Sequence, residues 1–368
     1  MNLKNVDIQT LLSKIKSEKL KMICIGAGDN LKEACNLFCN FDFFDNIYAI
    51  ADNYLKDFKW NGITKQTLTP AEIFSKINPQ EVVVYITPLS YPEIYEQLEQ
   101  MTQLKDVECY IHIFVIHIPI PYNFDSECRK SEKRLIPKKI HYCWFGGKEI
   151  PEQNKVWMES WPKYCPDYEI IKWNEDNYDI TKNEYMYSAY KENKYAHVSD
   201  YARLDIVCEH GGIYLDSDVE LLKNIDTLLY NKCFIGTSVL GVLNTGLGFG
   251  AVSDFPLISA FRDYYDDFPG DCDNWFIENC CYHQTKVMSN YSDFATVNKP
   301  QYIGEAAILP TDVLSPIDWR GNPSAFNTNT HAIHHYAASW LNPEEIEERC
   351  SDLQKYRNFW NKYFKELK

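Results

Sequence analysis

The chain has 368 residues and a formal net charge of −15 at pH 7, with 52 acidic and 37 basic side chains. A hydrophobic fraction of 45% is enough for a sizeable core, and the length predicts two or three domains. Because nucleic-acid binding requires a basic surface, the charge excludes nucleic acid as a partner but leaves room for a nucleotide held through a divalent cation.

The thirteen cysteines show no paired spacing of the zinc-binding kind and often lie in apolar runs, which predicts reduced, buried thiols. No stretch approaches the ~20 apolar residues of a membrane span, and the polar start Met1–Asp7 does not resemble a signal peptide. We therefore expect a cytoplasmic protein. Peripheral contact with the inner membrane face is an alternative, and the oligomeric state is unknown.

Residues 1–130 alternate apolar runs with helical patterns. The expected strands are 21–28, 47–52, 81–86 and 109–116, and the expected helices are 31–38 and 91–101. Such alternation predicts a parallel, doubly wound, Rossmann-like α/β domain. Gly26 and Gly28 fit the start of a dinucleotide fingerprint and Asp52 ends the second strand, but Leu31 occupies the third glycine position. A structural or partner-docking role is therefore favoured over nucleotide binding.

A polar linker, Asp125–Arg134, leads to a second α/β domain, assigned to residues 131–342. Strand-like runs occur at 135–147, 168–173, 212–215, 233–236 and 332–336. Residues 343–368 form a helical pattern that begins at Pro343 and is expected to pack on this second domain. The aromatic residues of that helix, among them Phe359, offer membrane contact as the alternative.

The most informative stretch lies in the second domain. Val198–His210 has helical spacing, which places Asp200 and Arg203 on one face, and Gly211 is suited to end the helix. The apolar run 213–215 then predicts a buried strand that leads into Asp-Ser-Asp.

Asp216 and Asp218 are two residues apart, so in an extended segment their side chains point the same way, ~6.5 Å apart. They follow the carboxyl end of a strand, where open α/β sheets bind ligands. Two such close carboxylates repel each other unless a cation lies between them. Mn²⁺ or Mg²⁺, which prefers oxygen ligands, is the expected cofactor.

The segments Ser199–Leu204 and Gly211–Asp218 together resemble glycosyltransferase family 32, whose members contain a DXD sugar-binding region. These are enzymes related to the yeast initiating mannosyltransferase and to bacterial capsule enzymes, and they are distantly similar to the clostridial glucosylating toxins. The resemblance covers roughly residues 135–341. It implies a GT-A type nucleotide-sugar transferase domain, here preceded by the smaller Rossmann-like domain.

The resemblance also implies roles for individual residues. Asp218 would bind the metal directly, Asp216 would contact the donor ribose and the metal through water, and Asp200 and Arg203 would hold the donor sugar and the diphosphate. We expect the donor to contact Trp144, Asp200, Arg203, Tyr214, Asp216, Asn244, Ser339 and Trp340. Core packing is the alternative for Trp144, and a simple turn is the alternative for Asn244.

A histidine distant in the chain commonly completes the metal shell in this fold. In a strand His334 and His335 face opposite ways, so only one of them can point at the metal. We assign the ligand role to His335, with His334 as the alternative.

The expected activity is metal-dependent, retaining transfer of a hexose from a nucleoside-diphosphate sugar to a glycan or lipid-linked acceptor, in capsule or other surface-polysaccharide synthesis. UDP-hexose is the first choice of donor and GDP-mannose the second. The alternatives are a metal-dependent phosphodiesterase and a non-catalytic carbohydrate-binding or scaffold protein. A phosphodiesterase would need more His and Asp ligands than this spacing offers, and the acidic net charge also counts against it. A scaffold protein would have little reason to retain Asp200 and Arg203 with the two aspartates.

Overall fold

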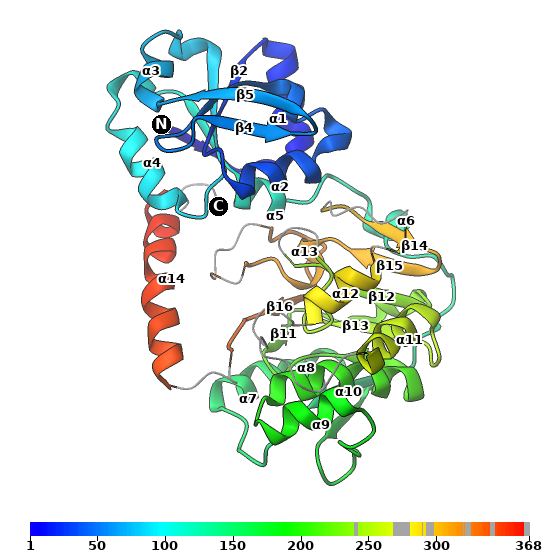
Figure 1. Ribbon diagram of the computed structural model, residues 1–368. Helices are drawn as coiled ribbons and strands as arrows, with labels where there is room; N and C mark the ends of the chain where they lie inside the picture. The colour runs from blue at the N-terminus through cyan, green and yellow to red at the C-terminus, as the bar shows by residue number, and fades with distance from the viewer. Residues whose placement is uncertain are drawn as a thin grey trace. The chain divides into compact units, whose positions relative to one another are not determined.

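The computed structural model describes residues 1–238, 242–267, 280–288, 290–291, 298–318, 320, 325–338 and 343–363. The chain forms two compact units, which Figure 1 colours along the sequence. Among the described residues, the first comprises Met1–Ile120 and 351–363, and the second begins at Pro121 and ends at Cys350. The two units thus meet in the sequence at residue 120 rather than at the expected 130.

The first unit is a twisted seven-stranded sheet with strand order β1-β7-β6-β2-β3-β5-β4. All of its pairs are parallel except the hairpin β4–β5, which the sequence analysis did not anticipate. Its strands are β1 Asn2–Lys4, β2 Lys21–Ile25, β3 Ile47–Ala51, β4 Asp57–Trp60, β5 Ile63–Leu68, β6 Val82–Ile86 and β7 Glu108–Ile111. Its helices include α1 Ile8–Glu18, α2 Asp29–Leu37, α3 Pro70–Phe74, α4 Tyr91–Glu99 and α5 His112–His117. The predicted α/β alternation is therefore present.

The expected strand 109–116 is wrong in its second half. β7 ends at Ile111, and the apolar residues that follow form the short buried helix α5. A short, continuous apolar run fits a buried strand and a buried helix equally well, because neither shows polar residues at a diagnostic spacing.

The glycine turn after β2 is closed by a carboxylate. Asp52 accepts hydrogen bonds from the backbone N–H groups of Ala27, Tyr54 and Leu55. These bonds lower the pKa of Asp52 although its partial burial works in the opposite direction. Since the carboxylate is engaged by the turn itself, the geometry favours the structural interpretation over ribose binding.

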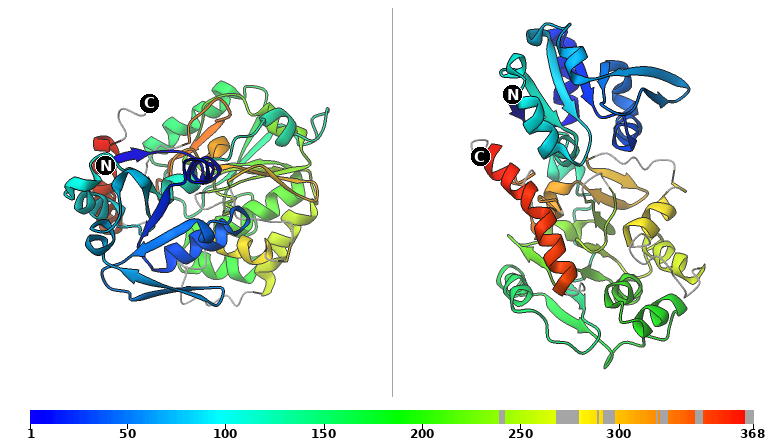
Figure 2. Two further views of the ribbon diagram at one scale, coloured as in Figure 1. Left: turned by 90° about the horizontal axis from the view of Figure 1, so that it is seen from above. Right: turned by 60° about the vertical axis from the view of Figure 1, so that its left-hand side comes forward.

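The C-terminal helix α14, Pro343–Tyr363, begins where the sequence predicted, but its second half packs on the first unit. Phe359 makes edge-to-face contacts with Tyr91 and Tyr95 of α4, and Tyr363 makes a further edge-to-face contact with Tyr95. Figures 1 and 2 show the last turns of this helix, in red, beside α4. The expectation that this helix packs on the second domain is therefore corrected for residues 351–363, while residues 343–350 belong to the second unit. Aromatic spacing identified a buried face but not the surface that covers it.

The second unit contains a mixed seven-stranded sheet of order β14-β15-β12-β13-β10-β8-β9, in which β13 and β14 are antiparallel to their neighbours. Its strands are β8 Lys139–Cys143, β9 Glu169–Trp173, β10 Gly212–Tyr214, β12 Cys233–Gly236, β13 Phe249–Ala251, β14 Gln301–Ile303 and β15 Ala306–Leu309. A separate ribbon pairs β11, Val219–Leu221, with β16, Ala332–His334. The helices include α6 Phe124–Glu127, α7 Glu152–Met158, α8 Ser160–Tyr164, α9 Glu184–Lys191, α10 Tyr195–His210, α11 Pro256–Asp263, α12 Cys280–Met288 and α13 Thr311–Leu314.

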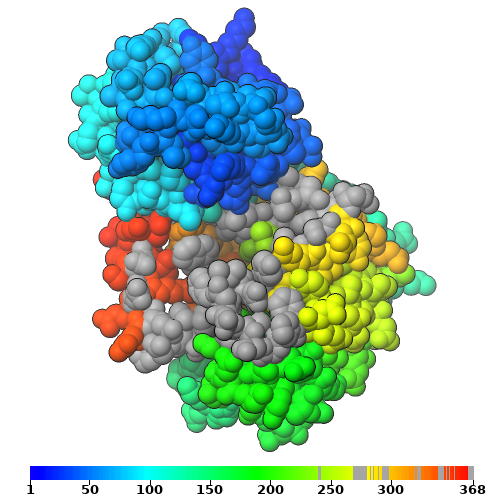
Figure 3. Space-filling model, in the orientation of Figure 1, coloured from blue at the N-terminus to red at the C-terminus, as the bar shows by residue number. Residues whose placement is uncertain are grey.

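Both faces of this sheet are covered. Tyr214 of β10 packs in a core with α9, α10 and α11, while Ile213 and Leu215 pack in a second core around Trp161 of α8. In Figure 3 the green-to-yellow segment of the chain that includes α9 to α12 forms the lower and right-hand part of the view. The α/β class is confirmed, and a mixed sheet with an acidic turn at a central strand is the arrangement expected of a GT-A type domain.

None of the helices in the described part of the chain is both long and apolar enough to cross a membrane.

Candidate active site

A helix, a glycine pair and a strand position the two aspartates. Helix α10 ends at His210, its C-cap residue Gly211 has a φ of 58°, and Gly212 follows with a φ of 114°. A Cβ atom on Gly212 would lie 2.8 Å from Nε2 of His141, so this position accepts only glycine. The chain then enters β10, which lies between β8 and β13 in the sheet. The acidic residues therefore emerge at the middle of a sheet edge.

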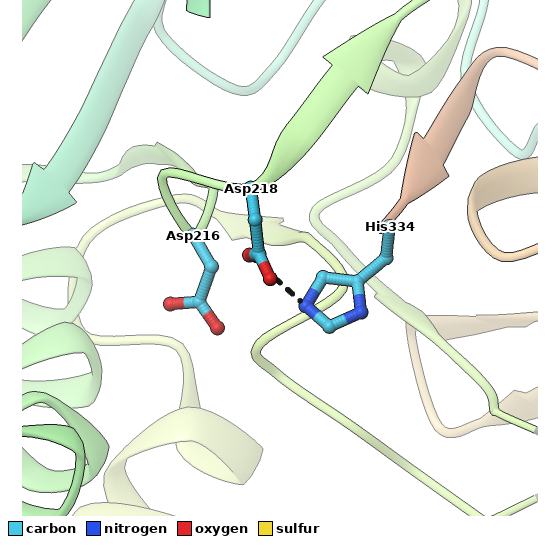
Figure 4. A group of neighbouring side chains, drawn as sticks. All are labelled: Asp216, Asp218 and His334. Atoms are coloured by element: carbon cyan, nitrogen blue, oxygen red, sulfur yellow. Dashed lines mark ion pairs between the residues drawn. The ribbon is translucent and has the colours of Figure 1, made fainter. Parts of the chain in front are cut away.

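The Asp-Ser-Asp segment is a turn and not an extended strand. The N–H of Val219 donates to the carbonyl of Asp216 over 3.0 Å. The two carboxylates nevertheless converge, and Figure 4 shows both directed to the same side, toward the ring of His334. The predicted convergence of Asp216 and Asp218 is thus present, through a different backbone conformation.

Asp218 is held by two partners from the distant segment around β16. Nε2 of His334 lies 3.2 Å from its Oδ1, and the N–H of Ala337 donates to its Oδ2 over 2.8 Å. Burial raises the pKa of such a carboxyl, but His334 and this backbone donor outweigh burial, so the pKa of Asp218 is lowered. Burial likewise disfavours the charged imidazole, and Asp218 outweighs it, so the pKa of His334 is raised.

Asp216 belongs to a network around Arg203. Nη2 of this buried guanidinium lies 3.1 Å from Oδ1 of Asp200 and 3.4 Å from Oδ1 of Asp216. The hydroxyl of Tyr214 donates to Asp216 over 3.0 Å. Burial opposes the charge of Arg203, but Asp216, Tyr214 and Asp200 raise its pKa well above the usual value. Burial raises the pKa of Asp216, and Asp218 adds to this effect while Arg203 opposes it.

The residues of this centre fit a divalent cation. One ligand atom each from Asp216, Asp218 and His334 lie within 4.8 Å of one another, which is close enough for a single ion to contact all three. Asp200 adds a third carboxylate beside Arg203, which supplies one permanent positive charge. Carboxylate and imidazole ligands are those that Mn²⁺ accepts.

His334, and not His335, faces this centre, so the assignment of the ligand role to His335 is corrected. In the β11–β16 pair His334 lies opposite Val219, which directs its side chain toward the aspartates. The ring of His335 lies on the other side, stacked on Trp157 with centroids 4.1 Å apart. Its Nε2 is 2.9 Å from Oε2 of Glu220.

Asn244 also lies beside the network. Its Oδ1 accepts a hydrogen bond from the N–H of Gly246, and a Cβ atom on Gly246 would lie 2.6 Å from Oδ2 of Asp216 and 3.2 Å from Nη1 of Arg203. The Asn-Thr-Gly turn therefore touches both charged residues. Gly246 was not predicted as a site residue, although its place two residues after Asn244 was the available signal.

Trp144 follows β8, the parallel neighbour of β10, so it lies at the same sheet edge as the aspartates. It is half-buried, and its Nε1 donates to the carbonyl of Lys148. This position is compatible with the expected contact to a base. Ser339 and Trp340 lie outside the described residues.

Residues 151–235 match the family described as "Glycosyltransferase sugar-binding region containing DXD motif". Among curated relatives, inositol phosphoceramide mannosyltransferase 3 of Schizosaccharomyces pombe is 30% identical over 139 residues, covering 36% of this chain and 39% of that protein. Mannosyl phosphorylinositol ceramide synthase CSH1 of Saccharomyces cerevisiae is 33% identical over 136 residues, covering 35% of each. The chain thus spans between 35% and 39% of the length of these relatives.

Two solved structures were also matched. The PaToxG glycosyltransferase has a TM-score of 0.35 and 18% identity, with 45% of this chain and 73% of that chain covered. A glycosyltransferase involved in the glycosylation of the major capsid of PBCV-1 has a TM-score of 0.34 and 14% identity, with 58% and 98% covered.

The resemblance indicated by the sequence motifs is confirmed: residues 151–235 match the DXD-containing sugar-binding region of glycosyltransferases, and the curated relatives are mannosyl-transferring enzymes. Domains of this family generally use a divalent metal, which agrees with the acidic centre described above.

Proposed function

We propose that this protein transfers a hexose from a nucleoside-diphosphate sugar to an acceptor hydroxyl in a metal-dependent reaction. The observation that carries the proposal is the convergence of Asp216, Asp218 and His334 beside the buried Arg203. A metal site made of two carboxylates and an imidazole, with the guanidinium of Arg203 beside it, is suited to binding a diphosphate.

The chemistry follows from the charge that develops on the diphosphate as the glycosidic bond breaks. A bound divalent ion, held by Asp216, Asp218 and His334, would neutralise part of that charge. Arg203 supplies a second, permanent positive charge. Because Asp200 and Asp216 hold its guanidinium in place, little reorganisation is needed when the leaving group gains charge. Retention of configuration is implied by the family resemblance, and same-face substitution is the mechanism with the fewest assumptions.

UDP-hexose and GDP-mannose are the proposed donors. The two named relatives are an inositol phosphoceramide mannosyltransferase and a mannosyl phosphorylinositol ceramide synthase. Their names support testing GDP-mannose alongside the UDP-hexoses. A glycan or a lipid-linked hydroxyl is the proposed acceptor, and a place in surface-polysaccharide synthesis is part of the proposal.

The test is a panel of UDP-glucose, UDP-galactose and GDP-mannose incubated with the full chain and Mn²⁺. Free sugar and nucleoside diphosphate are measured with and without excess EDTA. We expect chelator-sensitive release of sugar from one donor, and Arg203→Lys should lower that rate because its ammonium cannot pair with Asp200 and Asp216 in the same planar geometry.

The two rival functions give different products. Cleavage of bis-p-nitrophenyl phosphate without sugar release would support a phosphodiesterase. Donor or glycan binding without turnover across the panel would support a carbohydrate-binding protein.

A further inference from the structure

The α7–α8 segment supports one side of the β11–β16 ribbon. β11 pairs only with β16 in the described part of the chain, so its other edge presents backbone groups that need partners. The indole Nε1 of Trp161 donates to the carbonyl of Val219 over 2.8 Å, and the hydroxyl of Ser160 accepts from the N–H of Leu221 over 2.8 Å. Side chains of α8 thus form hydrogen bonds with backbone groups of β11 that a third strand would otherwise satisfy.

Helix α7 extends this support to the residues beside the metal ligands. Asn154 and Trp157 are three residues apart and therefore share one helix face. The Nδ2 of Asn154, which is 2% exposed, donates to Oγ of Ser217 over 3.0 Å. Ser217 is the residue between Asp216 and Asp218.

Trp157 contacts the segment that bears the third candidate ligand, His334, by stacking on the adjacent residue His335. Its ring is almost parallel to that of His335, with an interplanar angle of 7°. His335 is next to His334 in the chain, and its backbone N–H donates to the carbonyl of Asp218 over 3.0 Å. A shift of the His335 ring would therefore move the backbone that carries two of the three candidate ligands.

We propose that Asn154 and Trp157 are positioning residues of the metal centre, so that metal affinity depends on α7 although α7 supplies no ligand. One residue fixes the turn that bears both aspartates, and the other fixes the strand end that bears His334. Partners outside the ligand set orient ligands in this way in many metal sites, and their loss weakens metal affinity or activity by about 10–100-fold. The inference rests on the metal dependence of the proposed function, but not on any particular donor.

The test measures Mn²⁺ binding by the full chain without a sugar nucleotide, from the electron paramagnetic resonance signal of free Mn²⁺. Asn154→Ala and Trp157→Ala should each raise the Mn²⁺ dissociation constant by about 10-fold or more. Trp157→Phe keeps a stacking ring and should retain most of the affinity. Val156→Ala, at a position 57% exposed on the same helix, is the matched control and should bind like the wild type.

A double-mutant cycle separates positioning from general destabilisation. Ser217→Ala removes the same hydrogen bond from the turn side, so Asn154→Ala should add little in its presence. If either alanine variant on α7 fails to fold, Ser217→Ala, which removes the contact with Asn154 from the turn side, decides the matter. Wild-type Mn²⁺ affinity in a folded Trp157→Ala or Ser217→Ala protein, or additive effects in the cycle, would overturn the inference.

The two proposals fail in different ways. Failure of every donor in the panel, with Mn²⁺ binding sensitive to α7, would reject the transferase and leave the positioning role. An absence of Mn²⁺ binding by the wild type would overturn the positioning role itself.

Discussion

Nε2 of His334 lies 3.2 Å from Oδ1 of Asp218, across the pairing of β16 with β11. The register of this pair decides which of two adjacent histidines meets the aspartates. Because side chains alternate along a strand, a slip of one residue would exchange His334 for His335.

The same substitution at each histidine tests this assignment. His334→Phe should weaken Mn²⁺ binding by at least about 10-fold, because it removes a ligand and the imidazole that lies 3.2 Å from Oδ1 of Asp218. His335→Phe keeps a ring to stack on Trp157 and should cause a clearly smaller loss. Mn²⁺ titration of both folded variants gives the comparison. A larger loss for His335→Phe would return the ligand role to His335.

Asp218→Asn should lower sugar release by at least about 100-fold and abolish metal-dependent donor binding. The amide preserves shape but removes the negative charge that a divalent cation requires. Sugar release and donor binding are measured with Mn²⁺ present and after chelation. Asp179→Asn, at a solvent-exposed aspartate, is the control and should behave like the wild type. Full activity of Asp218→Asn, or of the wild type in excess chelator, would contradict the proposed role.

Local patterns in the sequence predicted much of the centre. Asp200 and Arg203 lie on one helix face, the glycine pair ends that helix, and the two aspartates converge after a buried strand. Each of these features depends on residues close together in the chain, where helical and strand periodicity apply.

Features that depend on tertiary packing were not predicted. The choice between His334 and His335 follows from the register of a two-stranded pair that brings distant segments together. The helix α5 and the packing of Phe359 on α4 depend likewise on which surface covers an apolar run. The sequence indicates that such residues are buried, but it does not indicate which surface of the protein covers them.

Gly246→Ala should lower kcat/KM for the donor by about 100-fold, since displacing a catalytic group by about 1 Å costs that much. The new Cβ would lie 2.6 Å from Oδ2 of Asp216, so the carboxylate must move. Donor kinetics and thermal unfolding are the measurements, and the fold should survive. Gly28→Ala is the matched control, because a Cβ atom on Gly28 would meet no other atom within 4 Å and the φ of this residue is −85°. Equal kinetics for the two variants would show that Asp216 tolerates the displacement.

Phe359→Ala should destabilise the first unit by about 3–5 kcal/mol, as expected for removal of a large buried ring. The side chain is 3% exposed and contacts Tyr91 and Tyr95. Hydrogen exchange should quicken in α4 and not in α10 of the second unit. Ile346→Ala, at an exposed position of the same helix, should leave both rates unchanged. Faster exchange in α10 instead would show that the helix stabilises the second unit, as the sequence had suggested.

The stability of the second unit should fall as the pH drops from 6.5 to about 4, in part because of His141. Its Nδ1 accepts a hydrogen bond from the indole of Trp173, and its Nε2 faces the carbonyl of Gly211 at 2.8 Å, so the neutral ring satisfies both partners. Burial lowers the pKa of His141 from 6.5 to about 4, while its bond to Gly211 opposes this only in part.

The unfolded chain therefore takes up a proton at His141 at a higher pH than the folded unit does. Between these two pKa values the unfolded state binds more protons, so the free energy of unfolding declines with falling pH, by roughly 2–3 kcal/mol in total. His141→Gln keeps a donor and an acceptor but cannot titrate. Urea unfolding of both proteins at several pH values should show a shallower decline for the variant. Parallel curves would mean that His141 has the same pKa in the folded and the unfolded chain, and would contradict this prediction.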